Sequence, residues 1–332
     1  MTLLVQPRRV NEPFSELALL LDFCFGDKAI LFDLGDLSAL SPREILRVSH
    51  VFVSHMHMDH FSGFDRLLGV SLYREKQVHI IGPPGLAAAV EAKLRAYTWN
   101  LLNEGSHDFT IFASDWTEEG FATAAAFRAR RAFEREGWRN TSTRIPLDDP
   151  EFSVEAVTLD HGIPCLAFAF QEKLRVNVHR SRLDELGFPV GLWLTNAKRA
   201  VRRGADAATE FTPNAGRKVT LGELLRDRAM VCGHGQRIVY ATDLAFHPEN
   251  VTRLSNLARC ADRLFIEAGF LEADRNLAAV KKHLTAAQAG AIARQAGAIS
   301  AYPMHLSPRY LGRQDELRVE FEAGFLGGFE SK

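Results

Sequence analysis

The sequence predicts an α/β fold in which two β-sheets lie between two layers of helices. Two observations support this fold class. β-rich runs occur in both halves of the 332-residue chain, and helical segments are interspersed among them in each half. Because a sheet or a helix must bury its apolar side against another element, this pattern suits two sheets sandwiched between helix layers. The composition, 46% hydrophobic and 24% charged residues, is that of a globular protein and excludes wholesale disorder.

In the first half of the chain, turn residues separate the β-rich runs. Strands are expected at residues 18–25, 29–34, 48–54 and 79–82. Gly26-Asp27-Lys28 joins the first two as a hairpin turn. Pro83-Pro84-Gly85 ends the fourth strand before a helix that runs from residue 86 to about residue 97.

The second half has the same mixture of elements. Strands are expected at residues 152–159, 165–171, 237–242, 263–267 and 299–302. Asp160-His161-Gly162 forms the turn between the first two of these strands. Helices are expected at 250–260 and 314–324, and Thr285 is a good N-cap for another that ends near Gly297.

Two stretches do not fit this alternation. Residues 103–150 are Arg-rich and irregular, and residues 177–228 are long and broken by Gly and Pro. Long segments without clear structure inside a compact domain are usually functional insertions. We therefore expect insertions at about 100–150 and at about 177–228.

The charge balance and the cysteines exclude several classes of protein. The 40 Lys and Arg residues against 41 Asp and Glu give a net charge of −1, so any nucleic acid must be bound by a local basic patch. The four cysteines have no CxxC spacing, which argues against a disulfide framework or a cysteine zinc site. The N-terminus lacks the order of a signal peptide, and no run reaches about 18 apolar residues. We expect a cytoplasmic protein with no membrane contact.

The string Ser54-His55-Met56-His57-Met58-Asp59-His60 follows a predicted buried strand and has the pattern HxHxDH. His55 and His57 can point the same way from an extended segment, because side chains there repeat every two residues. Imidazole and carboxylate groups are ligands for zinc and similar ions, and Asp59 with His60 can serve a second ion. A polar loop that happens to be rich in histidine is a poor alternative explanation for so dense a cluster.

One loop cannot complete two metal sites, so further ligands are expected at strand ends. His161 lies at a strand-to-turn junction, Asp243 follows the strand 237–242, and His305 follows the strand 299–302. Each of them alone is a weak signal, since a single histidine at a strand end is usually a surface or core residue. Their order after the HxHxDH string strengthens the assignment.

With these residues, the chain resembles the metallo-β-lactamase fold and, more closely, the ribonuclease Z family of tRNA 3′-processing endonucleases. Phe265-Ile266-Glu267-Ala268-Gly269 is similar to the HEAT motif of that family, and His283-Leu284-Thr285 is similar to its HST motif. His305-Leu306-Ser307-Pro308-Arg309-Tyr310 matches its terminal His-x-Ser-x-Arg-Tyr string. The resemblance implies one domain over residues 1–332, an αββα sandwich of two mixed sheets with an inserted arm.

The resemblance also implies two metal sites, with zinc as the expected ion and manganese possible. One zinc ion would be held by His55, His57, His161 and Asp243. The other would be held by Asp59, His60, Asp243 and His305. A carboxylate at position 243 can bridge two ions about 3.5–4 Å apart, which is the separation found in two-metal hydrolytic sites. A cysteine there, as in zinc β-lactamases, would suit a different second site, so Asp243 favours phosphodiester chemistry.

The implied activity is two-metal cleavage of the 3′ trailer of pre-tRNA by hydroxide attack on phosphorus. Asp59 would orient the attacking water and accept its proton. His283 would assist the leaving 3′-oxygen, and Glu267 would set the tautomer and charge of His283. Arg309 would bind a phosphate through its planar donor fork. The family also implies a homodimer in which the arm of one subunit serves the other.

The arm resemblance lies at residues 182–198, where Leu192 replaces the second proline of a Leu-Gly-x-Pro-x-Gly-Pro stretch. A basic cluster that could contact tRNA phosphates follows: Lys198, Arg199, Arg202 and Arg203. An ordinary solvated helix face explains the same residues. A second cluster could bind RNA, but we favour a segment that covers a core edge or a subunit contact: Arg128, Arg130, Arg131, Arg135, Arg139 and Arg144.

Several family features are absent. Residues 5–13 stand where the family has a Gly-Thr loop, Gly35-Asp36-Leu37-Ser38 replaces a Gly-Glu-Gly-Thr, and Ile266 and Gly269 replace two HEAT residues. These changes leave the metal ligands intact but alter the rim of the cleft. A dinuclear-zinc hydrolase acting on a small phosphodiester or another ester therefore stays open as an alternative. A binding protein with a dead site is disfavoured because all seven ligands are present.

Overall fold

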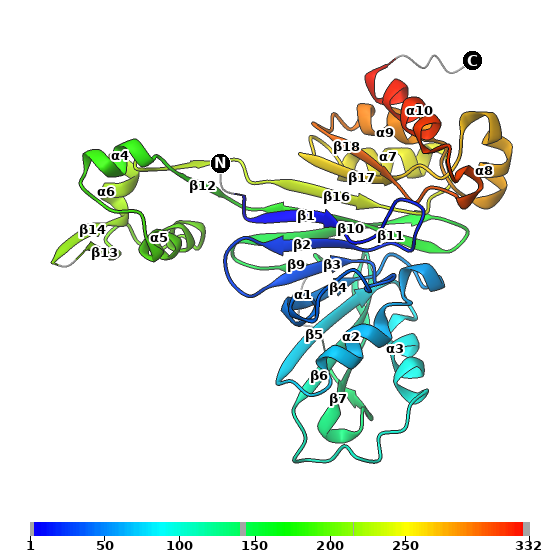
Figure 1. Cartoon of the computed structure of the whole chain (residues 1–332), viewed down its shortest axis with the longest axis horizontal. Coiled ribbons are helices and arrows are strands. Elements are labelled where there is room, and N and C mark those ends of the chain that lie inside the picture. The colour runs from blue at the N-terminus through cyan, green and yellow to red at the C-terminus, as the bar shows by residue number, and fades with distance from the viewer. Residues whose placement is uncertain (1–2, 140–143, 215, 328–332) are drawn as a thin grey trace.

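The structure is a computed structural model, and it describes residues 3–139, 144–214 and 216–327. Two mixed sheets pack face to face between two layers of helices, and an arm projects from one end of this body (Figure 1). This is the fold class that the sequence predicts.

The first sheet has eight strands in sequence order, and neighbours along the chain are neighbours in the sheet. Its strands are β1 (Val5–Arg9), β2 (Leu19–Phe23), β3 (Ala29–Phe32), β4 (Val48–Phe52), β5 (Lys76–Gly82), β6 (Phe109–Thr117), β7 (Gly120–Arg128) and β8 (Arg135–Gly137). The pairs from β3 to β6 are parallel and the others antiparallel. All four residues of β3 are buried, because layers cover both faces of this part of the sheet.

The second sheet has six strands in the order β18-β17-β16-β11-β10-β9. Their bounds are β9 (Leu147–Asp148), β10 (Phe152–Asp160), β11 (Pro164–Glu172), β16 (Arg237–Ala241), β17 (Arg263–Glu267) and β18 (Ala301–Met304). The pairs β16–β17 and β17–β18 are parallel. Phe32 of the first sheet stacks on Phe168 of the second, with ring centroids 5.4 Å apart, so aromatic side chains fill the space between the sheets.

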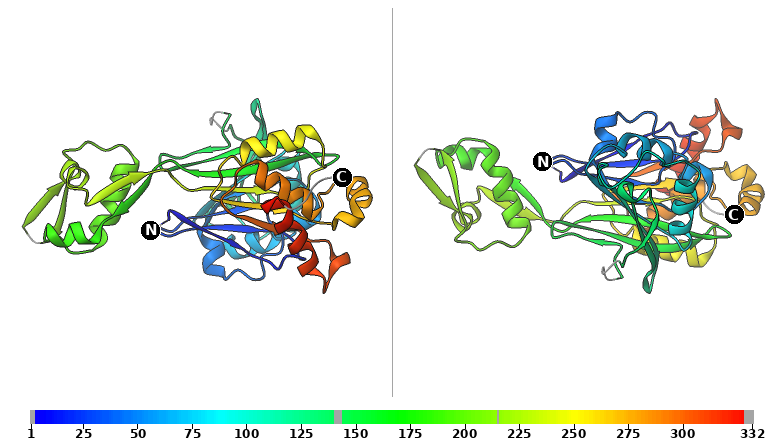
Figure 2. Two further views of the ribbon diagram at one scale, coloured as in Figure 1. Left: turned by 90° about the horizontal axis from the view of Figure 1, so that it is seen from above. Right: turned by 90° about the horizontal axis from the view of Figure 1, so that it is seen from below.

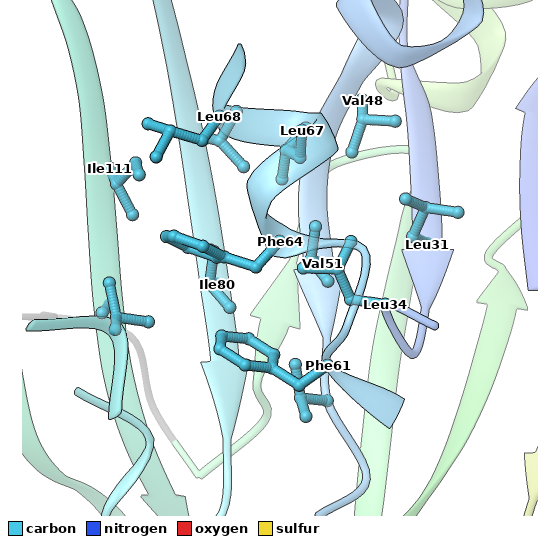
Figure 3. Close-up of a cluster of buried hydrophobic side chains, with 14 of the residues drawn as sticks. Leu31, Leu34, Val48, Val51, Phe61, Phe64, Leu67, Leu68, Ile80 and Ile111 are labelled. Atoms are coloured by element: carbon cyan, nitrogen blue, oxygen red, sulfur yellow. The ribbon is translucent and has the colours of Figure 1, made fainter. Parts of the chain in front are cut away.

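Each sheet carries helices on its outer face. The first sheet is covered by α1 (Pro42–Arg47), α2 (Phe64–Ser71) and α3 (Leu86–Arg95). The second is covered by α7 (Pro248–Leu257), α9 (Ala286–Gln295) and α10 (Gln314–Leu326), with the short α8 (Arg275–Lys281) beside them. Figure 3 shows Phe64, Leu67 and Leu68 of α2 packed on Val51 and Ile80 of the sheet.

Short 3₁₀ turns complete the loops of the body. They are η1 (Met58–His60), η2 (Ala129–Arg131), η3 (Glu272–Asp274) and η4 (Pro308–Tyr310). Thr285 is the N-cap of α9 and forms a capping box with Gln288, as its place in the sequence predicts.

The expectation of an irregular segment at 103–150 is wrong for most of its length. Residues 109–128 form two nine-residue strands, β6 and β7, that widen the first sheet. Gly120, with φ of 126°, allows the tight turn between them. Neither strand alternates buried and exposed positions, so the period of two residues that marks a half-buried strand is missing from this segment.

The arginines of the second cluster mostly pair with carboxylates of the body. Arg128 lies 3.2 Å from Asp108, Arg130 3.2 Å from Glu75 and Arg135 2.8 Å from Glu91. Phe133 between them is buried against Trp99 and Phe109. These contacts agree with a segment that covers a core edge. Arg139 and Arg144 are exposed.

The arm comprises residues between β11 and β16 and has a hydrophobic core of its own. Its elements are β12 (Arg175–Val178), α4 (Arg180–Glu185), α5 (Leu192–Arg202), β13 (Glu210–Asn214), β14 (Arg217–Thr220), α6 (Leu221–Arg226) and β15 (Met230–Gly233). β12 and β15 pair as an antiparallel two-stranded stalk. Both views in Figure 2 show the arm extending away from the two sheets.

Candidate metal centre

The predicted ligands meet where strands of both sheets end. His55 follows β4, Asp243 follows β16 and His305 follows β18, while His161 lies in the turn between β10 and β11. Asp243 and His305 have φ angles of 44° and 54°, a left-handed conformation that non-glycine residues rarely adopt. Such backbone strain of about 1–3 kcal/mol is typical of functional sites.

In the first group, the possible ligand atoms all lie within 4.8 Å of one another. They belong to His55, His57, His161 and Asp243. Nε2 of His55 lies 3.4 Å from Oδ2 of Asp243, and Nε2 of His161 lies 3.7 Å from the same oxygen. These four residues are the set expected for the first ion.

A second group contains Asp59, His60 and His305. Nε2 of His60 lies 3.3 Å from Oδ2 of Asp59 and 3.4 Å from Oδ2 of Asp243. Nδ1 of His305 lies 2.6 Å from Oδ1 of Asp243. Asp243 therefore lies between the two groups, where a bridging carboxylate is expected.

The donor set fits a metal ion. Among the described residues, the buried Nε2 atoms of His55 and His60 have no hydrogen-bond partner. A buried polar atom without a partner costs about 1–3 kcal/mol, so a native fold retains one where a ligand satisfies it. Imidazole nitrogen and carboxylate oxygen are the donors preferred by zinc and similar divalent ions.

The carboxylates of Asp59 and Asp243 favour positive charge in the second group. Hydrogen bonds from His305 and His60 hold the pKa of Asp59 well below its usual range. Burial disfavours protonated His305, but Asp243 and Asp59 outweigh burial and raise the pKa of His305 to about 10. In the first group, burial and neighbouring histidines lower the pKa of His57, which leaves it neutral as a ligand must be.

Asp33 supports the centre, although no motif in the sequence singles it out. Its buried carboxylate lies 2.7 Å from Nδ1 of His60 and accepts hydrogen bonds from Tyr240 and Ser54. An outer carboxylate of this kind fixes the tautomer of a ligand histidine, so Nε2 of His60 faces the ligand group. The only signal in the sequence was an aspartate at the end of an apolar strand.

The expected catalytic pair lies next to the ligand groups. Nδ1 of His283 lies 2.9 Å from Oε2 of Glu267 and 3.9 Å from Oδ1 of Asp243. Glu267 is fully buried, and its other oxygen accepts the backbone N–H of Leu244 at 2.6 Å. Burial disfavours the charged imidazole, but Glu267 outweighs it and raises the pKa of His283. The geometry suits a histidine that donates a proton.

A cleft of about 520 Å³ opens onto both groups and His283. Its wall includes Phe14, Ser15 and Glu16, which the sequence analysis did not single out. This N-terminal segment is held at both ends, because Leu306 N–H donates to Pro13 O and Leu17 N–H donates to Asp59 O. Arg309 is exposed in η4, beside the lining residues Ser307 and Pro308.

The basic cluster of α5 differs from expectation, because it faces the body of the protein. Lys198 is only 9% exposed, and the side chain of Arg202 is 5% exposed. Arg199 and Arg203 are more open, at 46% and 54%. The apolar face of α5 enters the arm core and its basic face lies against the body. Lys198 and Arg202 are therefore enclosed while Arg199 and Arg203 stay open, and contact of this cluster with tRNA phosphates stays a prediction.

None of the helices in the described part of the chain is long and apolar enough to cross a membrane. No protein-family model matches the chain.

Among solved structures, the chain is similar to the metallo-β-lactamase-fold protein YhfI from Bacillus subtilis, with a TM-score of 0.52, 17% identity and coverage of 94% of this chain and 86% of that one. It is equally similar to the short form of human tRNase Z, with a TM-score of 0.52, 18% identity and coverage of 92% of each chain. These likenesses show the metallo-β-lactamase fold.

Sequence relatives show the family. The chain is 32% identical over 290 residues to ribonuclease Z of Deinococcus radiodurans, which covers 86% of this chain and 84% of that protein. It is 28% identical over 293 residues to ribonuclease Z of Bacteroides fragilis, with 86% and 81% covered. With its predicted ligand residues gathered at the strand ends of a metallo-β-lactamase fold, the chain belongs to the ribonuclease Z family.

Proposed function

We propose that this ribonuclease Z-like endoribonuclease removes the 3′ trailer of pre-tRNA with two zinc ions bound between its sheets. One observation carries the proposal: two ligand groups with Asp243 between them open onto the same cleft as His283, which Glu267 holds. Shared carboxylates are typical of two-metal centres that cleave phosphodiesters.

In this proposal His55, His57, His161 and Asp243 hold one ion, and Asp59, His60, Asp243 and His305 hold the other. When bound, the ions supply Lewis-acid activation of water and neutralise charge on the phosphate. Zinc is preferred because imidazole dominates the donor set, and manganese is the second candidate.

The protein side chains handle the protons. The Asp59 side chain is partly open to the cleft, so its carboxylate can orient the attacking water and accept a proton from it. His283, held by Glu267, donates a proton to the leaving 3′-oxygen. Arg309 binds a phosphate at the rim. The products are a tRNA with a 3′-hydroxyl and a trailer with a 5′-phosphate.

A small phosphodiester is the second candidate substrate. Glu16 and Phe14 line the cleft, and a carboxylate at the rim opposes the approach of a polyanionic RNA strand. Gly269 also leaves open space beside the cleft. A Cβ added there would meet its neighbours only at ordinary contact distances of 3.5 Å or more. Gly269 is one of the two positions at which the sequence differs from the HEAT motif.

The wider organisation is part of the same proposal. Residues 1–332 form one domain with the arm as an insertion. Two chains associate as a homodimer, so that the arm of one reaches tRNA bound at the other. The enzyme acts in the cytoplasm, where its substrate is processed.

The test is incubation of the zinc-loaded protein with a pre-tRNA that carries a 3′ trailer, in parallel with a generic phosphodiester. The expected result is a single cut at the trailer that leaves a 3′-hydroxyl on the tRNA. Turnover of the generic substrate with intact pre-tRNA would favour the small phosphodiester instead. Inertness toward both would refute the phosphodiesterase assignment.

A further inference from the structure

Helix α5 lies between the arm core and the body, and its two faces have different contacts. Leu194, Ala197 and Val201 are buried in the arm core. The basic residues of α5 occupy positions i, i+1, i+4 and i+5, a spacing that places them on one face. They are Lys198, Arg199, Arg202 and Arg203.

Glu172 is the centre of the contact between this face and the body. It is the last residue of β11, and its side chain is 0% exposed. Nη2 of Arg202 donates to its Oε1 at 3.3 Å, and the backbone N–H of Gln236 donates to its Oε2 at 3.1 Å. Since Gln236 lies on the return connection to β16, one carboxylate joins α5 to both chain connections between body and arm.

The two connections are also in direct backbone contact. The N–H of Glu172 donates to the carbonyl of Gln236 at 2.8 Å. A Cβ at Gly235 would lie 1.6 Å from the carbonyl oxygen of Glu172, so only glycine fits there. The base of the arm is therefore packed tightly.

The remaining basic side chains of α5 contact the body too. Nζ of Lys198 lies 5.6 Å from the ring centroid of Phe25, in the turn between β2 and β3. Nε of Arg199 and Nε of Arg203 each lie 3.9 Å from Oε1 of Glu151, which precedes β10. The side chain of Glu151 is 14% exposed.

We propose that Glu172, assisted by Glu151, clamps the arm to the body in one orientation. The basic residues of α5 then affect RNA binding by holding the arm in place and not by contacting phosphate. Glu172 is therefore a positioning residue. Removing one partner of a buried ion pair leaves an uncompensated charge, so the loss of Glu172 releases α5 from the body. The consequence for RNA rests on the proposed tRNA substrate.

The direction in which pre-tRNA cleavage changes after a substitution distinguishes a clamp from direct phosphate contact. Glu172→Gln and Glu151→Gln each remove a negative charge and free arginines. If those arginines bound phosphate, pre-tRNA cleavage would improve. The clamp predicts that kcat/KM for pre-tRNA falls at least tenfold, mainly through KM, while turnover of a generic phosphodiester changes less than twofold. Glu322→Gln on α10, on the side away from the arm, makes the same charge change and leaves both activities unaltered.

Amide hydrogen exchange tests the clamp without RNA. The stalk and its joins to the body span residues 173–178 and 230–236, and the clamp predicts faster exchange there in Glu172→Gln, with the sheets of the body unchanged. If Glu172→Gln does not fold, Glu151→Gln provides the same comparison. Unchanged stalk exchange, or pre-tRNA cleavage equal to or above the parent level, would overturn the clamp. If the parent cleaves no pre-tRNA, the proposed substrate fails while the exchange result still decides on the clamp.

Discussion

At the scale of single residues, the candidate ligands could be found in the sequence, whereas the residues that support them could not. HxHxDH is dense enough to identify His55, His57, Asp59 and His60 without a structure. Asp33 lies 21 residues before Ser54 and reaches His60 only because β3 and β4 are parallel neighbours. A contact created by strand pairing leaves no local pattern, so the sequence could not assign it.

Replacing Asp33 with Asn should weaken the second metal site. The amide can no longer accept the full set of bonds from His60, Tyr240 and Ser54. Loss of an outer-shell partner lowers metal affinity about 10–100-fold. Competition with a chelating dye measures the affinity of each site.

The control for that variant is Asp115→Asn. Asp115 is also buried, but it accepts backbone N–H groups of Gly85 and Ala87 at the start of α3. It should lower stability without changing metal affinity. Equal metal affinity in Asp33→Asn and the parent would remove Asp33 from the account.

Replacing His283 with Ala should abolish turnover while both ions stay bound. The lost proton donor accounts for about 10²–10⁴ in rate, since general acid catalysis contributes that much. Turnover of pre-tRNA and zinc content, measured on the same sample, check the prediction. Loss of zinc from the variant would make His283 structural.

At the scale of elements, the β2–β3 hairpin and the capped helix α9 could be predicted because each depends on a few neighbouring residues. The turn at Gly26-Asp27-Lys28 and the N-cap Thr285 are confirmed by β2–β3 pairing and by α9. β1, β6 and β7 were not predicted, because their place depends on a sheet edge supplied by residues elsewhere.

Stacked histidines across β4 and β5 should make the first sheet sensitive to acid. His50 and His79 are cross-strand partners with ring centroids 4.9 Å apart. Burial, followed by the charge of His79, lowers the pKa of His50 to about 3. The folded state therefore keeps His50 neutral, while the unfolded chain takes up a proton below a pH of about 6.5.

Proton uptake by the unfolded chain determines how the stability of the fold changes with pH. Between pH 6.5 and 3 the unfolded state binds more protons at His50, so stability is full above this window and falls as the pH drops through it. The slope from one such group is at most about 1.4 kcal/mol per pH unit. Urea unfolding at pH 7 and pH 5 should show a smaller loss in His50→Phe than in the parent. An identical loss in both would exclude His50 as a cause.

At the scale of the whole molecule, the sequence predicted an arm but not its contacts with the body. The cluster 198–203 has the composition of a phosphate-binding surface. Its partners Phe25, Glu151 and Glu172 lie between 30 and 173 positions before the side chains that they contact, and they come from three separate parts of the body. The composition of a helix face shows its charge, whereas its contacts are known only from the tertiary fold.

The proposed role of Asp243, which is to join two metal sites in one cleft, has a direct test in the metal content of the protein. Elemental analysis of the purified protein and of Asp243→Ala, with His107→Ala at an exposed histidine as control, tests it most directly. We expect two zinc ions per chain in the parent and control, and fewer than one in Asp243→Ala, with pre-tRNA cleavage lost in parallel. One ion per chain in the parent, or an unchanged zinc content in Asp243→Ala, would contradict it.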